Sequence, residues 1–346
     1  MSPLSPRFRG RAAGLAVVVL AVAPLLAGGP ASPRAAQAVV PGGNGRIVFA
    51  SDRTGNFEIF VMNPDGSGVV QLTDDPAEDW EPAWSPDGTQ IAFTRDVAGN
   101  SEIFVMNADG TGAVNVTNSY HFDDEAVWSP DGKRIAWRSN RSGDAEIFTM
   151  NPDGSEVVQA FVSDGLDDEP SWSPDGARFA IRSERTGDPE IFVLGLDGSA
   201  PLQLTMNPEH SDDDPAWSPD GTKIAYRTRT DDSQGSDIFA VNPDGTARVN
   251  LTNRSGRQID PAWSPDGTKI AYGEQPSMAP ERKDDGEVWV MNADGTGPTN
   301  ITNRPDAYDG DPDWAVAPAT TPTSGTVPAT GEPVATTTPP GVPQPT

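Results

Sequence analysis

The sequence predicts an all-β protein, a six-bladed β-propeller built from four-stranded antiparallel blades. The main observation is a repeat, because Trp-Ser-Pro-Asp-Gly begins at Trp84, Trp128, Trp172, Trp217 and Trp263, at intervals of 44, 44, 45 and 46 residues. A degenerate sixth copy, Pro312-Asp313-Trp314, follows after 51 residues. A period in the mid-forties with four short strands in each repeat is typical of propeller blades.

Each repeat has the same order of elements. The Trp ends a strand, and the Ser-Pro-Asp-Gly turn leads into an apolar triplet such as Ile91-Ala92-Phe93. A polar loop precedes a third strand of the type Glu-Ile-Phe-Val-Met-Asn, and a second Asp-Gly turn leads to a short fourth strand such as Val70-Gln71-Leu72-Thr73. The first repeat begins at Ile47 without the strand that ends in Trp, so we expect the C-terminal strand at Trp314 to complete the first blade and close the ring.

Turn chemistry and apolar runs support the blades. Pro at the second position of each turn supplies the φ of about −65° that the turn needs, and Gly accepts a positive φ. The apolar strands are nearly unbroken rather than alternating, which is the pattern of a sheet that is covered on both faces. Each blade of a propeller is covered in this way by its two neighbours.

Both ends of the chain differ from the repeats. Arg7, Arg9 and Arg11 precede an apolar segment, and Ala36-Gln37-Ala38 has the small-x-small pattern of a cleavage site, so residues 1–38 are predicted to be a signal peptide. We expect the propeller over residues 39–317. Of the 29 residues in 318–346, 17 are Pro or Thr, which predicts a disordered tail.

Composition excludes several classes of function. The chain has 51 Asp and Glu against 24 Lys and Arg, a net charge of −27, so it would be repelled by nucleic acid and by anionic membranes. It contains no Cys and two His, which excludes disulfides, Cys-ligated metal centres, a thiol nucleophile and a three-His site within one chain. We expect no membrane insertion after removal of the signal peptide, and a monomer.

The five full Trp-Ser-Pro-Asp-Gly motifs resemble the WD40-like (PD40) repeat of TolB-like β-propeller proteins, over roughly residues 44 to 314. The resemblance implies that the Trp strand is innermost, at a central channel. Family members of the bacterial Tol system carry an α/β domain before the propeller, and we expect this chain to lack it. The related peptidases carry a hydrolase domain, and no Gly-x-Ser-x-Gly motif is present here.

The loops that enter the inner strands are strongly acidic, and we expect them to crowd the mouth of the channel. Such an acidic mouth would attract a cation or a basic partner. We also expect the acid two or three residues before Pro-x-Trp to make a structural bond in each blade, often to a neighbouring Arg. The candidate binding residues are Asp75, Asp79, Trp80, Asp123, Asp124, Asp167, Asp168, Asp212, Asp213, Asp260, Asp309 and Asp311.

Two histidines and the acidic loops are candidate metal sites. His121 and His210 both lie seven residues before a Trp, each with an Asp two or three residues on, so a metal-dependent active site is possible there, although two exposed loop histidines are the simpler interpretation. No cofactor is required by the sequence. Carboxylate oxygens at variable spacing suit Ca²⁺ better than Mg²⁺ or Zn²⁺, so the same acidic loops are a candidate calcium site.

The sequence therefore favours an exported, secreted or periplasmic, non-enzymatic binding or scaffold protein of the cell envelope. Its partner would be an envelope or extracellular protein with a basic segment. One alternative is a metal-dependent polysaccharide lyase or hydrolase, for which His121 and His210 would be required. The other is a structural protein displayed at the surface. The five motif Trp are expected in the core, and Trp80, which has no aromatic counterpart in the other repeats, is expected to be partly exposed.

Overall fold

The computed structural model describes residues 43–163, 165–207, 210–229, 235–275 and 286–317. The predicted signal peptide and the predicted tail lie outside these residues. The described residues form 24 strands, and no helix occurs among them. In this part of the chain there is accordingly no helix long and apolar enough to cross a membrane.

Each repeat contributes an inner, a second, a third and an outer strand. The inner strands are β4 (Asp79–Trp84), β8 (Asp123–Trp128), β12 (Asp167–Trp172), β16 (Asp212–Trp217), β20 (Gly256–Trp263) and β24 (Asp309–Val316). The second strands are β1 (Asn44–Ser51), β5 (Gln90–Asp96), β9 (Ile135–Ser139), β13 (Arg178–Ser183), β17 (Ile224–Arg229) and β21 (Lys269–Gln275).

The remaining strands complete the antiparallel order. The third strands are β2 (Glu58–Met62), β6 (Ser101–Asn107), β10 (Glu146–Met150), β14 (Glu190–Gly195), β18 (Gly235–Val241) and β22 (Glu287–Asn292). The outer strands are β3 (Val70–Gln71), β7 (Val114–Asn115), β11 (Val158–Gln159), β15 (Leu202–Gln203), β19 (Val249–Asn250) and β23 (Thr299–Asn300). Outer strands of two residues leave little exposed edge for pairing with other chains.

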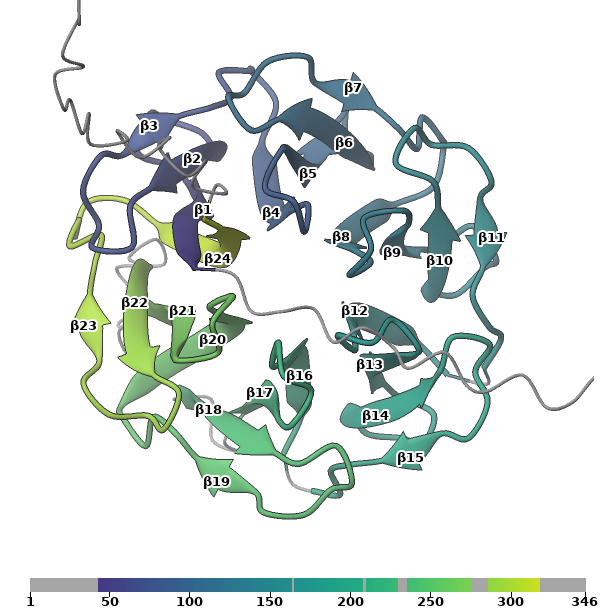
Figure 1. The fold of residues 1–346 in the computed structure, drawn as a ribbon. Coiled ribbons are helices and arrows are strands. Elements are labelled where there is room, and N and C mark those ends of the chain that lie inside the picture. Colours follow the sequence, from purple (N-terminus) through teal and green to yellow (C-terminus); the bar gives the residue numbers. More distant parts are fainter. Residues whose placement is uncertain (1–42, 164, 208–209, 230–234, 276–285, 318–346) are drawn as a thin grey trace, which may run out of the picture. The chain divides into compact units, whose positions relative to one another are not determined.

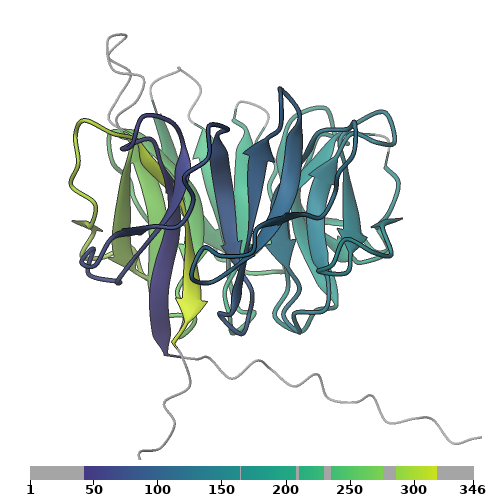
Figure 2. The ribbon, with the colours of Figure 1, turned by 90° about the horizontal axis from the view of Figure 1, so that it is seen from above.

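The inner strands face a common centre (Figure 1). Consecutive inner strands contact one another in the order β4, β8, β12, β16, β20 and β24, and β24 contacts β4. The expected closure is confirmed: β24 pairs antiparallel with β1, with Ile47 opposite Trp314 and Asn44 opposite Val316. Figure 2 shows that β1 begins and β24 ends at the same edge of the assembly.

The prediction of six four-stranded blades is wrong. Four sheets have four strands, in the orders β24-β1-β2-β3, β4-β5-β6-β7, β11-β10-β9-β8 and β12-β13-β14-β15. The other eight strands, β16 to β23, form one continuous sheet, because β18 pairs parallel with β20 at Gly235–Gly256 and Ser236–Arg257.

A local change of sequence lies beside this parallel contact. In the repeat that contains β20, Gln258 stands where the other inner strands carry a buried Asp. Ser236 donates a hydrogen bond of 2.9 Å to the Gln258 carbonyl oxygen, and this bond lies next to the parallel pairing. The neutral residue and the direct bond between neighbouring repeats thus occur at the same place in the ring.

The hydrophobic core lies between neighbouring sheets rather than at the centre of the ring. One cluster joins Ala92, Ile103, Trp128 and Trp137 from successive repeats, and the other clusters are built in the same way. Trp84, Trp128, Trp217 and Trp314 are 5–8% exposed, which agrees with the expected core role. Trp172 and Trp263 are half-buried instead, so the expectation that all five motif Trp are core residues is wrong for these two.

Candidate functional site

The acidic residues at the start of the inner strands fall into three positions with different surroundings. The first position is fully buried, in contrast to the expected location at an open mouth. It is occupied by Asp79, Asp123, Asp167, Asp212 and Asp309, each 0% exposed. Their arginine partners, in the same order, are Arg95 at 2.6 Å, Arg141 at 2.8 Å, Arg185 at 2.8 Å, Arg248 at 3.9 Å and Arg53 at 2.7 Å.

These first-position residues hold the fold together. Asp123, for example, accepts two bonds of 2.8 Å from Arg141, one of 2.9 Å from the Trp137 indole and one of 2.8 Å from Ser119. The expected structural bond to a neighbouring Arg is therefore confirmed. Because a buried charge is tolerated when it is paired and hydrogen-bonded, Asp79, Asp123 and Asp167 are explained without a ligand. Asp212 and Asp309 are paired less completely, since Asp212 Oδ1 and Asp309 Oδ2 are buried without a hydrogen-bond partner among the described residues. Asp75 also pairs with Arg95, at 2.9 Å, and is more exposed.

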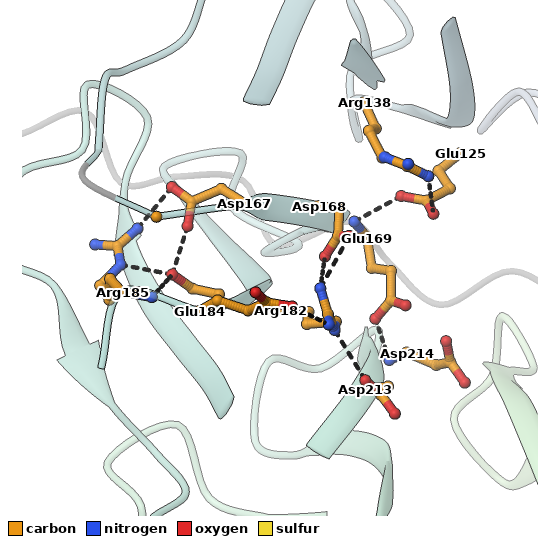
Figure 3. A network of polar contacts seen from close by, with 12 residues as sticks. Glu125, Arg138, Asp167, Asp168, Glu169, Arg182, Glu184, Arg185, Asp213 and Asp214 are labelled. Atoms are coloured by element: carbon orange, nitrogen blue, oxygen red, sulfur yellow. Dashed lines mark hydrogen bonds and ion pairs between the residues drawn. The ribbon is translucent and has the colours of Figure 1, made fainter. Parts of the chain in front are cut away.

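The second position is charged in three repeats and neutral in the other three. Asp124, Asp168 and Asp213 lie opposite Arg138, Arg182 and Arg227 on the adjacent second strands. Their shortest contacts to those arginines are 3.3, 3.0 and 2.8 Å. Figure 3 shows Arg182 between Asp168 and Asp213, so this arginine links two neighbouring repeats. The neutral pairs are Trp80–Thr94, Ile259–Gly273 and Gly310–Ala50.

The third position lines the central channel. Its residues, which we call the channel ring, are Glu81, Glu125, Glu169, Asp214, Asp260 and Asp311. The cavity at this place has a volume of about 570 Å³, and its other lining residues come mainly from the inner strands, with Asp313 as a further acid and Arg227 as the one base. Every inner strand has an irregular register at this point, and every ring residue has a positive φ, between 51° and 57°.

Backbone in this region costs about 1–3 kcal/mol for a residue other than Gly. The irregularity turns the side chain of the third position into the channel, whereas the side chains of the first two positions face the sheet. Each ring carboxylate can then reach the next repeat. Glu81 accepts from the backbone N–H of Glu125 at 3.0 Å, and Glu125 accepts from that of Glu169 at 2.8 Å. The N–H of Asp214 donates to Glu169 at 2.5 Å, as drawn in Figure 3.

Burial and mutual repulsion raise the pKa values of Glu81, Glu125, Glu169, Asp260 and Asp311. Burial raises the pKa of Glu81 to about 8, and the negative charges of Asp124 and Asp311 add to the shift. The pKa values of Glu125, Glu169 and Asp260 are well above their ordinary range, first because of burial and then because of neighbouring carboxylates. The pKa of Asp311 is also raised by burial. A ring of this kind favours an entering positive charge, which would compensate the carboxylates when they ionise.

The channel ring is electrically asymmetric. Arg138 lies 3.4 Å from Glu125, and Arg227 lies 3.1 Å from Asp214. In the repeat of Glu169, Arg182 pairs with the preceding residue, Asp168, at 3.0 Å. Among the described residues, no ion pair within 4 Å is found for Glu81, Glu169, Asp260 or Asp311. The charge of Arg182 acts on Glu169, whereas Thr94, Gly273 and Ala50 occupy the arginine positions in the repeats of the other three acids. We call Glu81, Asp260 and Asp311, whose own repeats lack this arginine, the uncompensated half. Trp80, the residue before Glu81 on β4, is half-buried and is not among the residues that line the cavity.

Sequence reasoning named Asp260 and Asp311 of the channel ring and missed Glu81, Glu125, Glu169 and Asp214 as site residues. The available signal was their fixed offset, since an acid stands three residues before the Trp in every repeat. The sequence alone did not separate the three acidic positions. The separation depends on the local irregularity of the inner strand, which reverses the simple alternation of side chains.

The histidines do not form a metal centre among the described residues. His121 is exposed, and His210 is half-buried with one ring nitrogen, Nδ1, buried and without a hydrogen-bond partner in the part of the chain that the structure describes. Over the same residues no group of three His, Asp or Glu is arranged to hold a metal ion. The geometry thus gives no support to a metal-dependent lyase or hydrolase at these positions.

Comparison with known proteins agrees with the repeat pattern. A family model described as the TolB beta propeller domain (PD40) matches residues 31–125, 125–234 and 156–277. A segment of 47 residues is 55% identical to the Protein TolB homolog of Chlorobaculum tepidum; it covers 14% of this chain and 11% of that relative. The match to this relative therefore spans about a tenth of its length.

Solved structures show the same fold at low identity. TolB from Acinetobacter baumannii has a TM-score of 0.67 and 22% identity, over 78% of this chain and 66% of that one. A putative TolB from Agrobacterium tumefaciens has a TM-score of 0.62 and 20% identity, over 78% and 98%. The hydrazine synthase of Kuenenia stuttgartiensis has a TM-score of 0.64 and 16% identity, over 80% of this chain and 47% of that one. Proteins of another activity therefore contain this fold as well.

Proposed function

Because the chain belongs to the TolB beta-propeller (PD40) family, we propose that it is a non-enzymatic binding module whose uncompensated half receives a basic segment of a protein partner. The observation that carries this proposal is the asymmetry of the channel ring. Glu81, Asp260 and Asp311 have no cationic neighbour within ion-pair distance among the described residues, whereas Glu125 and Asp214 do. A lysine or arginine side chain of the partner would supply the missing charge.

The surroundings of these acids fit a side chain better than a bare ion. The cavity of about 570 Å³ is large enough for an extended side chain with part of its backbone. Asp260 and Asp311 already share a hydrogen bond, which a cation between them would replace.

We also propose that the protein is exported, which determines where its partner is found. A basic segment is attracted over a distance by a net charge of −27, and the N-terminal segment 1–38 has the pattern of a signal peptide. The partner would then be a protein of the envelope or of the extracellular space. Calcium is the weaker second proposal for the same carboxylates, because no group of three His, Asp or Glu among the described residues is arranged to hold a metal ion.

The test is calorimetry with an acetylated, amidated pentalysine peptide at low salt. The variant Glu81→Gln with Asp311→Asn removes two charges of the uncompensated half. Asp65→Asn with Asp109→Asn is the matched control, because it removes two charges from exposed turns, where Asp65 and Asp109 bond Ser67 and Thr111. We expect the ring variant to weaken binding at least tenfold and to reduce its dependence on salt, and the control to bind as the native chain does.

Equal weakening in both variants would show that the peptide senses net charge alone, and the proposed site would be abandoned. A calcium titration of the same three proteins distinguishes the second occupant. Heat with Ca²⁺ that disappears in the ring variant, together with loss of peptide binding in Ca²⁺, would mean that the two compete for one site.

A further inference from the structure

The end of the channel opposite the channel ring is surrounded by prolines. Each Trp-Ser-Pro-Asp-Gly turn follows the end of an inner strand and brings its Pro to this end, where the side chains are partly exposed. We call Pro86, Pro130, Pro174, Pro219 and Pro265 the proline collar. These five residues share the lining of one cavity of about 190 Å³ with Trp172, Trp217, Ser218 and Val316.

Neighbouring turns of the collar touch where the Gly of one turn meets the Pro of the preceding turn. We call each such contact a joint; three joints are packed and one is open. A Cβ placed on Gly132 would lie 3.3 Å from Pro86, and the corresponding distances are 3.2 Å from Gly221 to Pro174 and 3.3 Å from Gly267 to Pro219. Each of these turns therefore rests on the proline of the preceding repeat. Gly176 should meet Pro130 in the same way, but nothing lies within 4 Å of its Cβ position.

A cleft occupies the open joint. It has a volume of about 320 Å³ and is lined by Ser129, Pro130, Asp131, Arg134, Trp172, Pro174, Asp175, Gly176 and Leu196. Trp172 lines both this cleft and the collar cavity, and its side chain is half-buried, whereas Trp84, Trp128 and Trp217 are at most 8% exposed. The cleft thus presents an aromatic ring between two prolines.

The partner of Trp172 on the adjacent strand differs from that of the other motif Trp. Trp84, Trp128, Trp217 and Trp263 lie opposite Ile91, Ile135, Ile224 and Ile270 on the adjacent second strands. Trp172 lies opposite Phe179, and the two ring centres are 4.5 Å apart. Trp263 is half-buried opposite an isoleucine, so the exchange for Phe179 does not by itself determine the exposure of Trp172.

We propose that the C-terminal Pro/Thr-rich segment of the same chain, residues 318–346, docks in this cleft. The starting point of the segment supports this occupant. Val316 lines the same collar cavity as Trp172, and the backbone N–H of Ala317 bonds the Gly43 carbonyl oxygen, so the chain leaves β24 at the rim of the collar. The segment needs no long path to reach the cleft.

Length and chemistry also fit. In a polyproline II conformation 29 residues extend to roughly 90 Å, at about 3.1 Å each, which exceeds any path across one end of a channel of this size. Such segments dock in grooves lined by aromatic residues, because their conformation is set before binding. The segment has eight Pro and one charged side chain, Glu332, so the acidic protein repels it little, and Arg134 lies in the cleft.

Because the segment is covalently attached to the propeller, even a weak contact is sufficient for it to occupy the cleft. A tether of this length presents the segment at an effective concentration on the order of millimolar. A peptide that binds with millimolar affinity when free would therefore occupy the cleft for a substantial part of the time. The same contact would not be detected at the micromolar concentrations of an ordinary binding assay with free peptide.

The absence of Cys makes the test direct, because labels attach at introduced cysteines alone. In the full chain, Thr338→Cys is combined with Ala177→Cys, an exposed position next to the cleft. The comparison pair combines Thr338→Cys with Tyr120→Cys, which is fully exposed in a loop before β8, at the other end of the channel. We expect energy transfer between the labels to be clearly higher for the pair at residue 177.

Two perturbations should abolish that difference. Trp172→Phe should lower the transfer to residue 177 by about half or more, whereas the matched control Trp263→Phe, which changes the other half-buried motif Trp, should not. Millimolar free peptide of residues 318–346 should lower it as well, and this measurement does not depend on how well a variant folds.

Equal transfer for the two pairs, or transfer to residue 177 that the free peptide leaves unchanged, would overturn the proposal. Transfer that falls when labelled protein is mixed with excess unlabelled protein would also overturn it, because the segment would then come from a second copy of the chain.

Discussion

The backbone N–H of Glu169 donates a hydrogen bond of 2.8 Å to the Glu125 carboxylate, 44 residues earlier in the sequence. The same relation joins Glu125 to Glu81 and Asp214 to Glu169. A side chain that faces the channel therefore also fixes the backbone of the next repeat at its irregular position. Binding at the ring and packing between repeats are served by the same carboxylates.

The first prediction concerns stability as a function of pH. Burial raises the pKa of Glu81 from its ordinary 4.5 to about 8. A carboxyl group whose pKa is higher in the folded state binds protons more tightly there, so its stabilising effect is complete below pH 4.5 and is lost as the pH rises toward 8. We expect the melting temperature to fall over this interval, through an effect on the order of a few kcal/mol.

Glu81→Gln should flatten this fall, because the amide cannot ionise. Asp65→Asn provides the control, since the pKa of Asp65 is lowered by its bonds to Ser67 and its titration lies below this interval. Scanning calorimetry between pH 4.5 and 8 on the three proteins checks the prediction. Parallel curves for the native chain and Glu81→Gln would contradict it.

The second prediction separates structural from channel acids. Asp123→Asn should destabilise the fold by about 3–5 kcal/mol, because it removes the charge that compensates buried Arg141. Asp74→Asn, at an exposed position in a loop of the same type, should change the free energy of unfolding by less than about 0.5 kcal/mol. Urea denaturation measures both. If Asp123→Asn were as stable as the native chain, the structural role assigned to the first position would be wrong.

The third prediction compares two tryptophans. Trp217 is 7% exposed and packs against Ala180, Ile191 and Val193 of the preceding repeat, so Trp217→Ala should cost about 3–5 kcal/mol. Trp80→Ala should cost clearly less, because Trp80 is half-buried. Equal losses in thermal unfolding would place Trp80 in the core.

The fourth prediction concerns closure. A chain that ends before Asp311 loses most of β24, which exposes the edge of β1 and the apolar residues Ile47 and Phe49 that pack with Trp314. We expect this product to aggregate. A chain that ends at Ala319 retains the strand and should melt within a few degrees of the full chain, as differential scanning calorimetry would show.

Much of the fold followed from the sequence because the repeats are local. The spacing of Trp84, Trp128 and Trp172 and the turn chemistry determined the strand order, and the missing first strand at Ile47 indicated the closure. The joined sheet was not predicted, since it depends on a short parallel contact between two repeats that the repeat motif does not contain.

The site was predicted less well, for a specific physical reason. Asp123, Asp124 and Glu125 are adjacent acids of similar chemistry, yet the first is buried with Arg141, the second faces Arg138 and the third enters the channel. Their directions depend on the positive φ at Glu125, which no local sequence rule predicts for a glutamate. The open joint at Gly176 was equally hidden, because the packing of one turn against the proline of the preceding repeat is a contact between repeats.

The pairing of β1 with β24 has a mechanical consequence. Asn44, near which the chain enters the ring, lies opposite Val316, near which it leaves. In an antiparallel pair loaded from the same end, the force acts on one pair of hydrogen bonds at a time rather than on the whole ladder. A pull between the two ends of the chain would therefore unzip the ring from Asn44–Val316 at low force, whereas anchoring through one end alone would leave this seam unloaded.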